Sequence, residues 1–317
     1  MSLLEILGKR LILGAATLLF VSVLVFLGTE ILPGDVAHAI LGQGATPELV
    51  QQIRERLGLN EPLHMRYLVW LGNFLSGDFG TSLANGADIG TEIARRSKNT
   101  IILASCTAVI AVPLSVLLGL AAAVKPGGMV DRAISSTSLA LISFPDFLVA
   151  VVLVTVFAVE LRWLPAIASI RPSYDLLDWI RVLILPVTGL TFTILAHMVR
   201  MTRSAVLNVL ASPAIEMALL KGVPRRRLLL RHALPNALGP IINVVALNLA
   251  YLISGVVVIE TLFNFPGLGR YMVEAVTNRD VPIVQTCAMI FCSFYVLLNM
   301  TADILSIVAN PRVRYKK

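Results

Sequence analysis

Charged residues and cysteines are scarce in this chain of 317 residues. Only 14% of the residues are charged, whereas 57% are hydrophobic and the mean hydropathy is +0.83. A chain of this composition cannot enclose its apolar surface in one water-soluble core. The three cysteines, Cys106, Cys287 and Cys292, fall in apolar stretches without C-x-x-C spacing, so neither a disulfide framework nor a zinc site is supported.

The sequence also lacks the motifs of ATP hydrolysis and of membrane enzymes. No run has the G-x-x-x-x-G-K-[ST] spacing of a phosphate-binding loop, so we expect that the chain neither binds nor hydrolyses ATP. The histidines His38, His64, His197 and His232 form no metal-ligand pattern, and no nucleophile stands near a suitable base. We therefore expect no catalytic residue, metal or cofactor in this chain.

Long apolar runs predict an all-α integral membrane protein with six transmembrane helices. A span of about twenty residues crosses the hydrocarbon core. Five spans of this length contain no charged residue: Leu11 to Thr29, Asn99 to Val124, Val182 to Val199, Ala233 to Ile259 and Val281 to Ala302. A sixth apolar run, residues 133–159, contains one charged residue, Asp146. A central aspartate costs roughly 2.5–3.5 kcal/mol, which so apolar a segment can tolerate.

The net charge of +7 could suggest a nucleic-acid partner, but the basic residues are distributed along the chain as in a membrane protein. With six crossings and a cytoplasmic N-terminus, fifteen of the 26 Lys and Arg residues fall in inner segments, which hold few acidic residues. The positive-inside rule therefore places both termini in the cytoplasm. An alternative is a signal peptide cleaved near Ala37-His38-Ala39, but the first apolar run is longer than the usual 7–15-residue signal core.

The chain divides into three parts: residues 1–32 with the first span, an external loop at 33–98, and a five-helix core at 99–317. The loop shows helix signals, since Thr46 can cap a helix that begins at Pro47 and ends near Gly58. A second amphipathic helix is predicted from near Pro62, with Tyr67, Trp70, Leu71 and Phe74 on it. These helices form either an external subdomain that meets a delivery protein or covers the pore, or interfacial helices with aromatic anchors.

A basic loop at about 203–235 separates two apolar spans. Ser212 can cap a short helix that starts at Pro213 and stops at Gly222, and Pro224 can start another. Its apolar face is predicted to hold Ile215, Ala218 and Leu219. Such an exposed helix, flanked by Arg225, Arg226 and Arg227, needs either lipid headgroups or a protein partner.

The spacing Glu216-x-Ala218, Gly222 and then Leu234-Pro235 resembles the EAA loop of bacterial ABC importer permeases. Met217 stands in place of the second alanine, and His232 in place of the usual isoleucine. Further segments are similar to the dipeptide/oligopeptide/nickel permease family, and they cover nearly the whole chain in order. These are Pro33-Gly34-Asp35, Leu57 to Asn73, Gly77 to Ser82, Glu260-Thr261-x-Phe263, Pro266-Gly267-Leu268-Gly269, Asn278-Arg279-Asp280 and Asn310 to Tyr315.

The resemblance implies the first of two paired permeases in the inner membrane, which supplies half of the translocation pathway for peptides or similar small solutes. The implied partners are a second homologous permease, two cytoplasmic ATPase subunits that bind ATP and Mg²⁺, and an extracytoplasmic solute-binding protein. The expected ATPase-coupling residues are Ile215, Glu216, Ala218, Leu219, Gly222 and Arg225.

Four acidic residues lie in or at the ends of spans, where carboxylates are functional candidates. Asp146 follows Pro145, and either faces the lumen of the pathway or bonds to a neighbouring helix. Asp303 can pair with Arg200 or Arg203, and Glu30 is expected at the outer interface. The pathway and gate candidates are Asp146, Glu260, Phe263, Pro266 and Gly267, of which Glu260 is expected to organise an external turn.

Two other classes remain as alternatives. A self-sufficient secondary transporter needs coupling carboxylates in several spans or an inverted repeat, and only Asp146 is central in a span. A membrane enzyme needs a catalytic constellation that the sequence lacks. Within the importer class, nickel, glutathione and other small solutes stay open, because selectivity is expected to reside in the binding protein.

Overall fold

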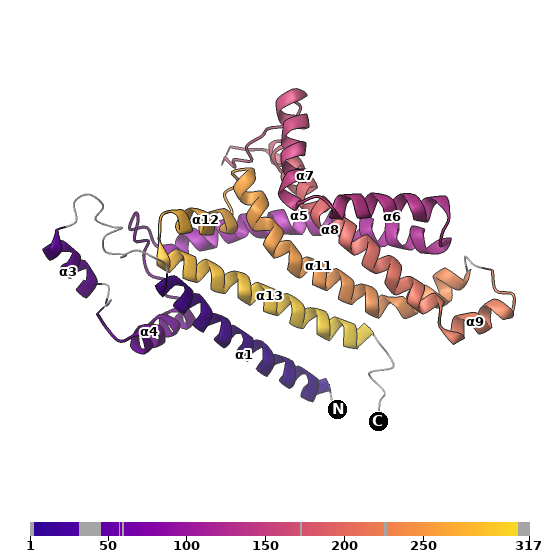
Figure 1. The fold of residues 1–317 in the computed structure, drawn as a ribbon, viewed down its shortest axis with the longest axis horizontal. Helices are drawn as coiled ribbons and strands as arrows, with labels where there is room; N and C mark the ends of the chain where they lie inside the picture. Colours follow the sequence, from indigo (N-terminus) through magenta and orange to yellow (C-terminus); the bar gives the residue numbers. More distant parts are fainter. Residues whose placement is uncertain are drawn as a thin grey trace. The chain divides into compact units, whose positions relative to one another are not determined.

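The computed structural model describes residues 3–31, 46–56, 58, 60–171, 173–224 and 227–309 (Figure 1). All regular elements in these ranges are helical, apart from one isolated bridge between Thr81 and Asp88. The predicted all-α class is confirmed. The helices are α1 (Leu3–Glu30), α3 (Pro47–Arg56), α4 (Leu63–Ser76), α5 (Ile89–Val124), α6 (Met129–Ile142), α7 (Asp146–Leu153), η2 (Val154–Glu160), α8 (Leu176–Leu210), α9 (Pro213–Leu220), η3 (Leu228–Ala233), α11 (Leu234–Leu262), α12 (Leu268–Thr277) and α13 (Val281–Ala309).

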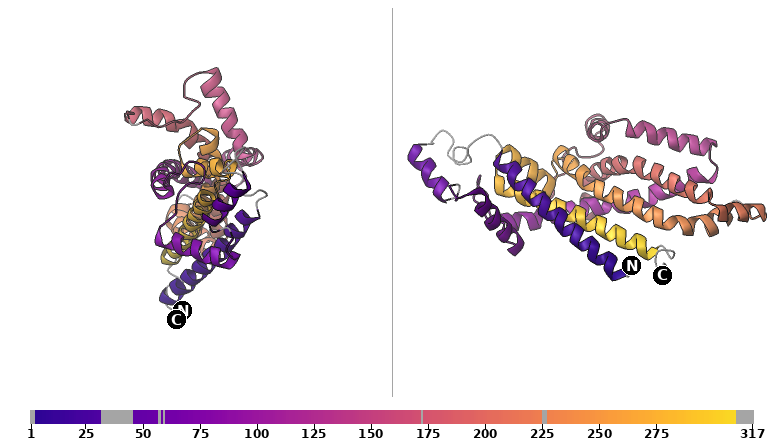
Figure 2. Two further views of the ribbon diagram at one scale, coloured as in Figure 1. Left: turned by 90° about the vertical axis from the view of Figure 1, so that its left-hand side faces the viewer. Right: turned by 60° about the horizontal axis from the view of Figure 1, so that its bottom comes forward.

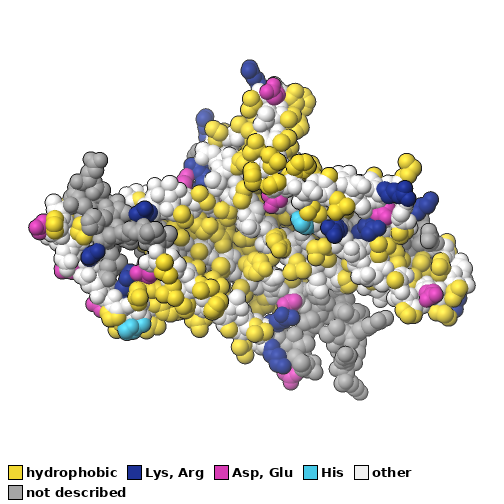
Figure 3. Space-filling model, viewed as in Figure 1, with side chains coloured by type: hydrophobic (Ala, Val, Ile, Leu, Met, Phe, Trp, Pro, Cys, Tyr) yellow, Lys and Arg dark blue, Asp and Glu magenta, His cyan; other side chains and the backbone are white. Residues whose placement is uncertain are grey.

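Five helices among the described residues are long and apolar enough to cross a membrane, and each overlaps one of the five predicted charge-free spans. They lie at Gly8–Glu30, Ile89–Val124, Leu176–Leu210, Leu234–Leu262 and Val281–Leu305. Many of their large apolar side chains are exposed, and Figure 3 shows hydrophobic side chains over long stretches of the visible surface. Such surface is stable in contact with lipid and not with water.

The sixth predicted span is a bent pair of helices. Residues 129–142 and 146–160 are long and apolar enough to cross a membrane only when taken together, and they meet at an angle of 98°. Pro145 lies at the break, with φ −58° and ψ 139°. A proline has no N–H to donate and disfavours helical geometry in the residue before it, so the helix ends at Ile142 and restarts at Asp146.

The first of two compact units contains Met1–Ile12, Ile101–Phe265 and Tyr295–Lys317. Its central element is α8, of which 72% of the most apolar stretch is buried. Helices α6 and α11 pack along α8 (Figures 1 and 2). At Gly255 an added Cβ would lie 3.3 Å from Leu190 Cδ2, and at Gly189 an added Cβ would lie 3.2 Å from Ile259 Cδ1. The missing side chains therefore allow α8 and α11 to approach closely.

The second unit contains Leu13–Thr100 and Pro266–Phe294. Both predicted loop helices are present: α3 begins at Pro47, with its Leu49 N–H 3.4 Å from the capping Thr46 hydroxyl, and α4 follows Pro62. Aromatic side chains then link α1, α4 and the segment after it, because consecutive ring centroids lie 5.5–6.2 Å apart along the series Phe26, Tyr67, Trp70, Phe74 and Phe79.

The end of α1 is joined to α4 by an ion pair within the second unit. Arg66 donates from both terminal nitrogens to Glu30, at 2.6 and 2.9 Å. Both side chains are about four-fifths buried. This two-point geometry fixes direction as well as distance, so α4 is held against the end of the first span.

Candidate functional site

The helix predicted in the basic loop is α9, and only two residues separate it from the end of α8 at Leu210. Ser212 lies at its N-cap with extended backbone, and Pro213 takes the first helical position as expected. The Ser212 hydroxyl makes no capping hydrogen bond; instead its carbonyl accepts from Ile215 and Glu216. The predicted boundary is right, but the predicted side-chain cap by Ser212 is not formed.

The C-terminal turn of α9 explains the spacing between Ala218 and Gly222. The Gly222 N–H donates to the Leu219 carbonyl at 2.9 Å, and the Val223 N–H donates to the Ala218 carbonyl at 3.2 Å. These two bonds define a Schellman motif, which requires a left-handed residue four positions after its first carbonyl. Gly222 occupies that position with φ +77°. The separation of four residues therefore follows from the geometry of a helix end.

The α9 helix has one buried side and one exposed side. Ile215 is 5% exposed and packs in a cluster with Val206, and Ala218 and Val223 lie against the same cluster. Leu219, expected on this apolar face, is instead half exposed. The exposed apolar side chains are Met217 at 56%, Leu219 at 50% and Leu220 at 76%.

Exposed charged residues lie in α9 and in the segment that follows it. Glu216, Lys221, Arg227 and Arg231 are exposed. Arg225, an expected coupling residue, lies outside the described residues. The second short helix is predicted to start at Pro224. The structure is helical from residue 227 onward, where η3 continues without a break into α11. The arrangement is a short, rigidly ended helix with a mixed apolar and charged surface, which is suited to docking in a groove of another protein.

Asp146 lies in the first turn of α7, directly after the 98° break, and its side chain is exposed. Its charge interacts electrostatically with His197 of α8. His197 is exposed in a stretch of α8 whose adjoining residues, Ala196 and Met198, are buried. The break therefore presents an exposed carboxylate that interacts with an exposed imidazole of α8.

Glu260 and Phe263 lie at the end of α11, and both are fully buried in the first unit. The Glu260 carbonyl accepts from the Phe265 N–H at 2.8 Å, with Asn264 in the left-handed region at φ 54°. The Phe263 carbonyl accepts from the Ala168 N–H at 2.7 Å. The backbones of both candidates thus belong to the turn that ends α11 and to its contact with the loop after η2.

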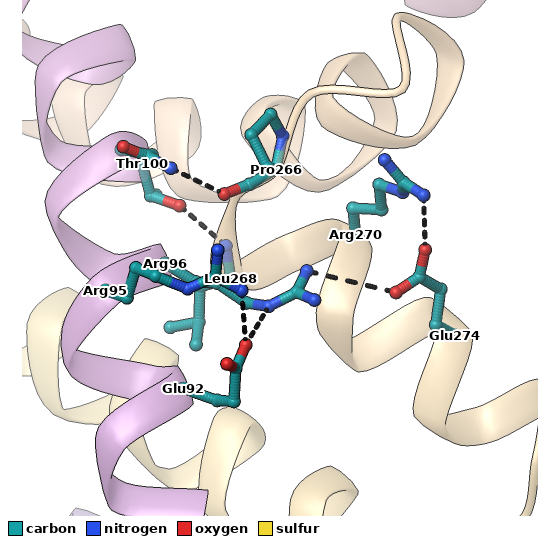
Figure 4. A network of polar contacts seen from close by, with 9 residues as sticks. Glu92, Arg95, Arg96, Thr100, Pro266, Leu268, Arg270 and Glu274 are labelled. Atoms are coloured by element: carbon teal, nitrogen blue, oxygen red, sulfur yellow. Dashed lines mark hydrogen bonds and ion pairs between the residues drawn. The ribbon is translucent and has the colours of Figure 1, made fainter. Parts of the chain in front are cut away.

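Pro266 and Gly267 belong to the second unit, where they start α12. The Pro266 carbonyl accepts from Asn99 at 2.8 Å, and the N–H of Leu268 donates to the Thr100 hydroxyl at 2.8 Å. Gly267 is the N-cap of α12. Two polar side chains at the start of an apolar span therefore hold this turn (Figure 4).

An ion network continues from this turn along α5 and α12 (Figure 4). Arg96 is 3.1 Å from Glu92 and 3.9 Å from Glu274, and its guanidinium lies 4.4 Å from the centre of the Tyr271 ring. Burial raises the pKa of Tyr271 to about 12, so this phenol stays neutral. We did not predict Arg96, Asn99 and Thr100 from the sequence, although polar residues at the boundary of a long apolar run are candidates for hydrogen bonds to neighbouring elements.

The partner predicted for Asp303 is wrong. Asp303 pairs with Arg10 of α1 at 3.0 Å, and Arg203 pairs instead with Asp131 of α6. The Arg10–Asp303 and Arg203–Asp131 pairs each join residues that are far apart in the sequence, so position along the chain does not identify the partner of either acid. The Arg10 pair is about half exposed on the arginine side, so its contribution is about 0–1 kcal/mol.

Comparisons with known proteins agree with the resemblance seen in the sequence. Residues 115–315 match the family described as "Binding-protein-dependent transport system inner membrane component", and residues 3–104 match the related N-terminal family. The "Probable peptide ABC transporter permease protein" of Sinorhizobium fredii is 38% identical over 307 residues, which cover 97% of this chain and 98% of that protein. The glutathione transport system permease protein GsiC of Salmonella choleraesuis and of Escherichia coli (strain K12) is 36% identical over 308 residues, with the same coverage. The chain thus belongs to the family of inner-membrane permease components of binding-protein-dependent ABC transport systems.

Proposed function

We propose that this permease forms half of the translocation pathway of an ATP-driven importer for peptides or similar small solutes. The relatives named above are a peptide permease and a glutathione permease, and glutathione is itself a tripeptide. Nickel and other small solutes are the alternatives within the same machine. The complete importer contains a second homologous permease, two cytoplasmic ATPase subunits and an extracytoplasmic solute-binding protein.

The observation that carries this proposal is the structure of α9 between the long helices α8 and α11. Its Ile215 side packs on the protein, whereas Met217 and Leu220 face outward beside charged residues. An exposed apolar surface of this kind gains free energy when a partner covers it. We propose that Ile215, Glu216, Ala218, Leu219, Gly222 and Arg225 form the coupling element that docks on an ATPase subunit.

The energy comes from the partners. The sequence contains no phosphate-binding loop, so ATP and Mg²⁺ bind in the ATPase subunits and this chain is a pore subunit without enzymatic activity. The basic loop that holds α9 is cytoplasmic by the positive-inside rule, as are both termini. This orientation places α9 on the side where ATP is available.

Asp146 and His197 mark the pathway in this proposal. Both side chains are exposed in this chain, and a charge facing lipid would cost about 2.5–3.5 kcal/mol at the centre of a span. An aqueous path between two permeases removes that cost. Glu260 then organises the turn that ends α11, and Phe263, Pro266 and Gly267 are further pathway or gate candidates.

The first test is co-purification of this subunit from its native membrane, followed by identification of the proteins that accompany it. Recovery of a second permease and ATPase subunits, with ATP hydrolysis stimulated by a solute-binding protein, is the expected result. Mass spectrometry of the ligand released from that binding protein then identifies the solute. A lone protein that transports solute in ATP-free liposomes would show a secondary carrier instead.

A further inference from the structure

A two-point ion pair joins α6 to the end of α8 that leads to α9. Arg203 Nε lies 2.6 Å from Asp131 Oδ1, and Arg203 Nη2 lies 2.9 Å from Asp131 Oδ2. Both residues belong to the first unit. This side-on geometry restrains the rotation of one helix against the other as well as their separation.

The carboxylate is buried and well satisfied. The Asp131 side chain is only 5% exposed, and it also accepts from the Gly127 N–H at 2.7 Å and from the Ser135 hydroxyl at 3.2 Å. Four donors thus occupy the two oxygens of one aspartate. A buried pair of this kind differs from an exposed ion pair, because removing one partner leaves a desolvated charge.

Close packing holds the same part of α8 against α5. A Cβ added at Gly119 would lie 2.8 Å from Thr202 Cβ and 3.0 Å from the Val199 carbonyl oxygen. Thr202, the neighbour of Arg203, is fully buried. The helix is therefore fixed by α5 on one side and by the ion pair to α6 on another.

Helix α9 is attached directly to this region. Its buried residue Ile215 packs in one cluster with Val206 of α8 and Ala123 of α5. Val206 is one turn beyond Arg203 along α8. Packed interiors are stiff, so the contact between α9 and α8 is a firm one, and it lies one turn from Arg203.

The other end of α6 leads to the pathway candidate. Asp131 is in the first turn of α6, and the 98° break and Asp146 follow the last turn. Figure 3 shows acidic and basic side chains gathered over α6 and the adjoining part of α8. Only residues 143–145 separate the last turn of α6 from Asp146.

We propose that Asp131 and Arg203 are positioning residues that transmit the movement of α9 into α6 and thereby to Asp146. This inference rests on the proposed function, since it takes ATPase docking at α9 as the source of the movement. The ion pair makes the inner ends of α6 and α8 move as one body, so that each ATPase cycle changes the geometry of the break.

The test uses the complete transporter, with spin labels at Ser136→Cys on α6 and Ala211→Cys between α8 and α9. Both sites are exposed, and the native cysteines are replaced by alanine. Label distances are measured by pulsed electron resonance without nucleotide and after trapping with ATP and vanadate. Binding-protein-stimulated ATP hydrolysis is measured in parallel.

A double-mutant cycle isolates the pair: Asp131→Asn, Arg203→Gln and the combination of both. We expect the parent to show one narrow distance that trapping does not change. Each single variant should broaden this distribution and lose at least tenfold of the stimulation, and the double variant should be no worse than either single variant. Arg132→Gln is the matched control, because Arg132 is the exposed neighbour of Asp131 on α6.

Retention of the ATPase subunits during purification separates transmission from folding, because misfolded variants would lose them. Single variants that keep a narrow distance and full stimulation would overturn the inference, as would strictly additive losses in the double variant. If the unaltered chain co-purifies with no ATPase subunit, the proposed function fails first and this inference falls with it.

Discussion

The clearest quantitative prediction concerns Gly222, because the strain of its left-handed backbone can be distinguished from steric crowding of an added side chain. Its φ of +77° is a left-handed conformation, and no atom lies within 4 Å of the position that a Cβ would take. Gly222→Ala should therefore fit without a clash in this chain. Its cost is the conformational strain of a non-glycine residue there, about 1–2 kcal/mol.

A cost of this size reduces the population with an intact Schellman turn by a factor of about 5–30, because each 1.4 kcal/mol is tenfold. Gly222→Asn should cost less, since asparagine is enriched in the left-handed region. Gly222→Leu has the same backbone strain as Gly222→Ala. Any further loss of coupling in the leucine variant therefore indicates that its larger side chain collides with the docked ATPase subunit. We expect coupling to fall in the order glycine, asparagine, alanine and leucine.

The assay is solute uptake per ATP hydrolysed in proteoliposomes that contain the full transporter and its binding protein. Membrane insertion and yield of each variant serve as controls for folding. Leu220→Asp supplies a comparison, because it leaves the turn intact and changes the most exposed apolar residue of α9. Normal coupling in Gly222→Ala and Gly222→Leu would refute the reasoning, and equal losses in asparagine and leucine variants would refute the role of backbone strain.

Two further predictions concern packing within each unit. Gly119→Ala should cost about 1–3 kcal/mol through overpacking against Thr202, seen as a lower melting temperature in detergent; Gly28→Ala, with open space at its Cβ, is the control and should not be destabilising. Asp280 is 1% exposed and accepts a hydrogen bond from the Ser82 hydroxyl at 2.5 Å. Asp280→Asn should weaken this charge-assisted bond by about 1–2 kcal/mol. Amide hydrogen exchange in residues 78–88 should then rise about tenfold. Unchanged exchange there would contradict the second prediction.

Local signals explain why the helices of the external loop could be located from sequence. The Thr46 cap, the proline starts and the glycine at position 77 each act within one turn of the chain, and the structure places α3 and α4 accordingly. The same applies to the boundaries of α9. Capping and turn geometry depend on a few neighbouring residues, so they are readable without the tertiary fold.

Pairing between distant residues was not readable in the same way. Asp303 had two plausible arginine partners by position along the chain, yet it pairs with Arg10. Arg203 meets Asp131, which lies 72 residues away in sequence. Charge type limits the candidates, but only the packing of helices brings one of them within bonding distance.

The sequence by itself determined that this protein spans a membrane, where five of its spans lie, and that a short helix interrupts them in a basic loop. These properties follow from hydrophobic length and local backbone chemistry. The tertiary structure decided the size of the bend before Asp146, the complete burial of Glu260, and the ion pair by which Asp131 of α6 holds Arg203 of α8. Such features depend on which helices meet, and that is settled by the combined packing of the whole chain and not by any local segment.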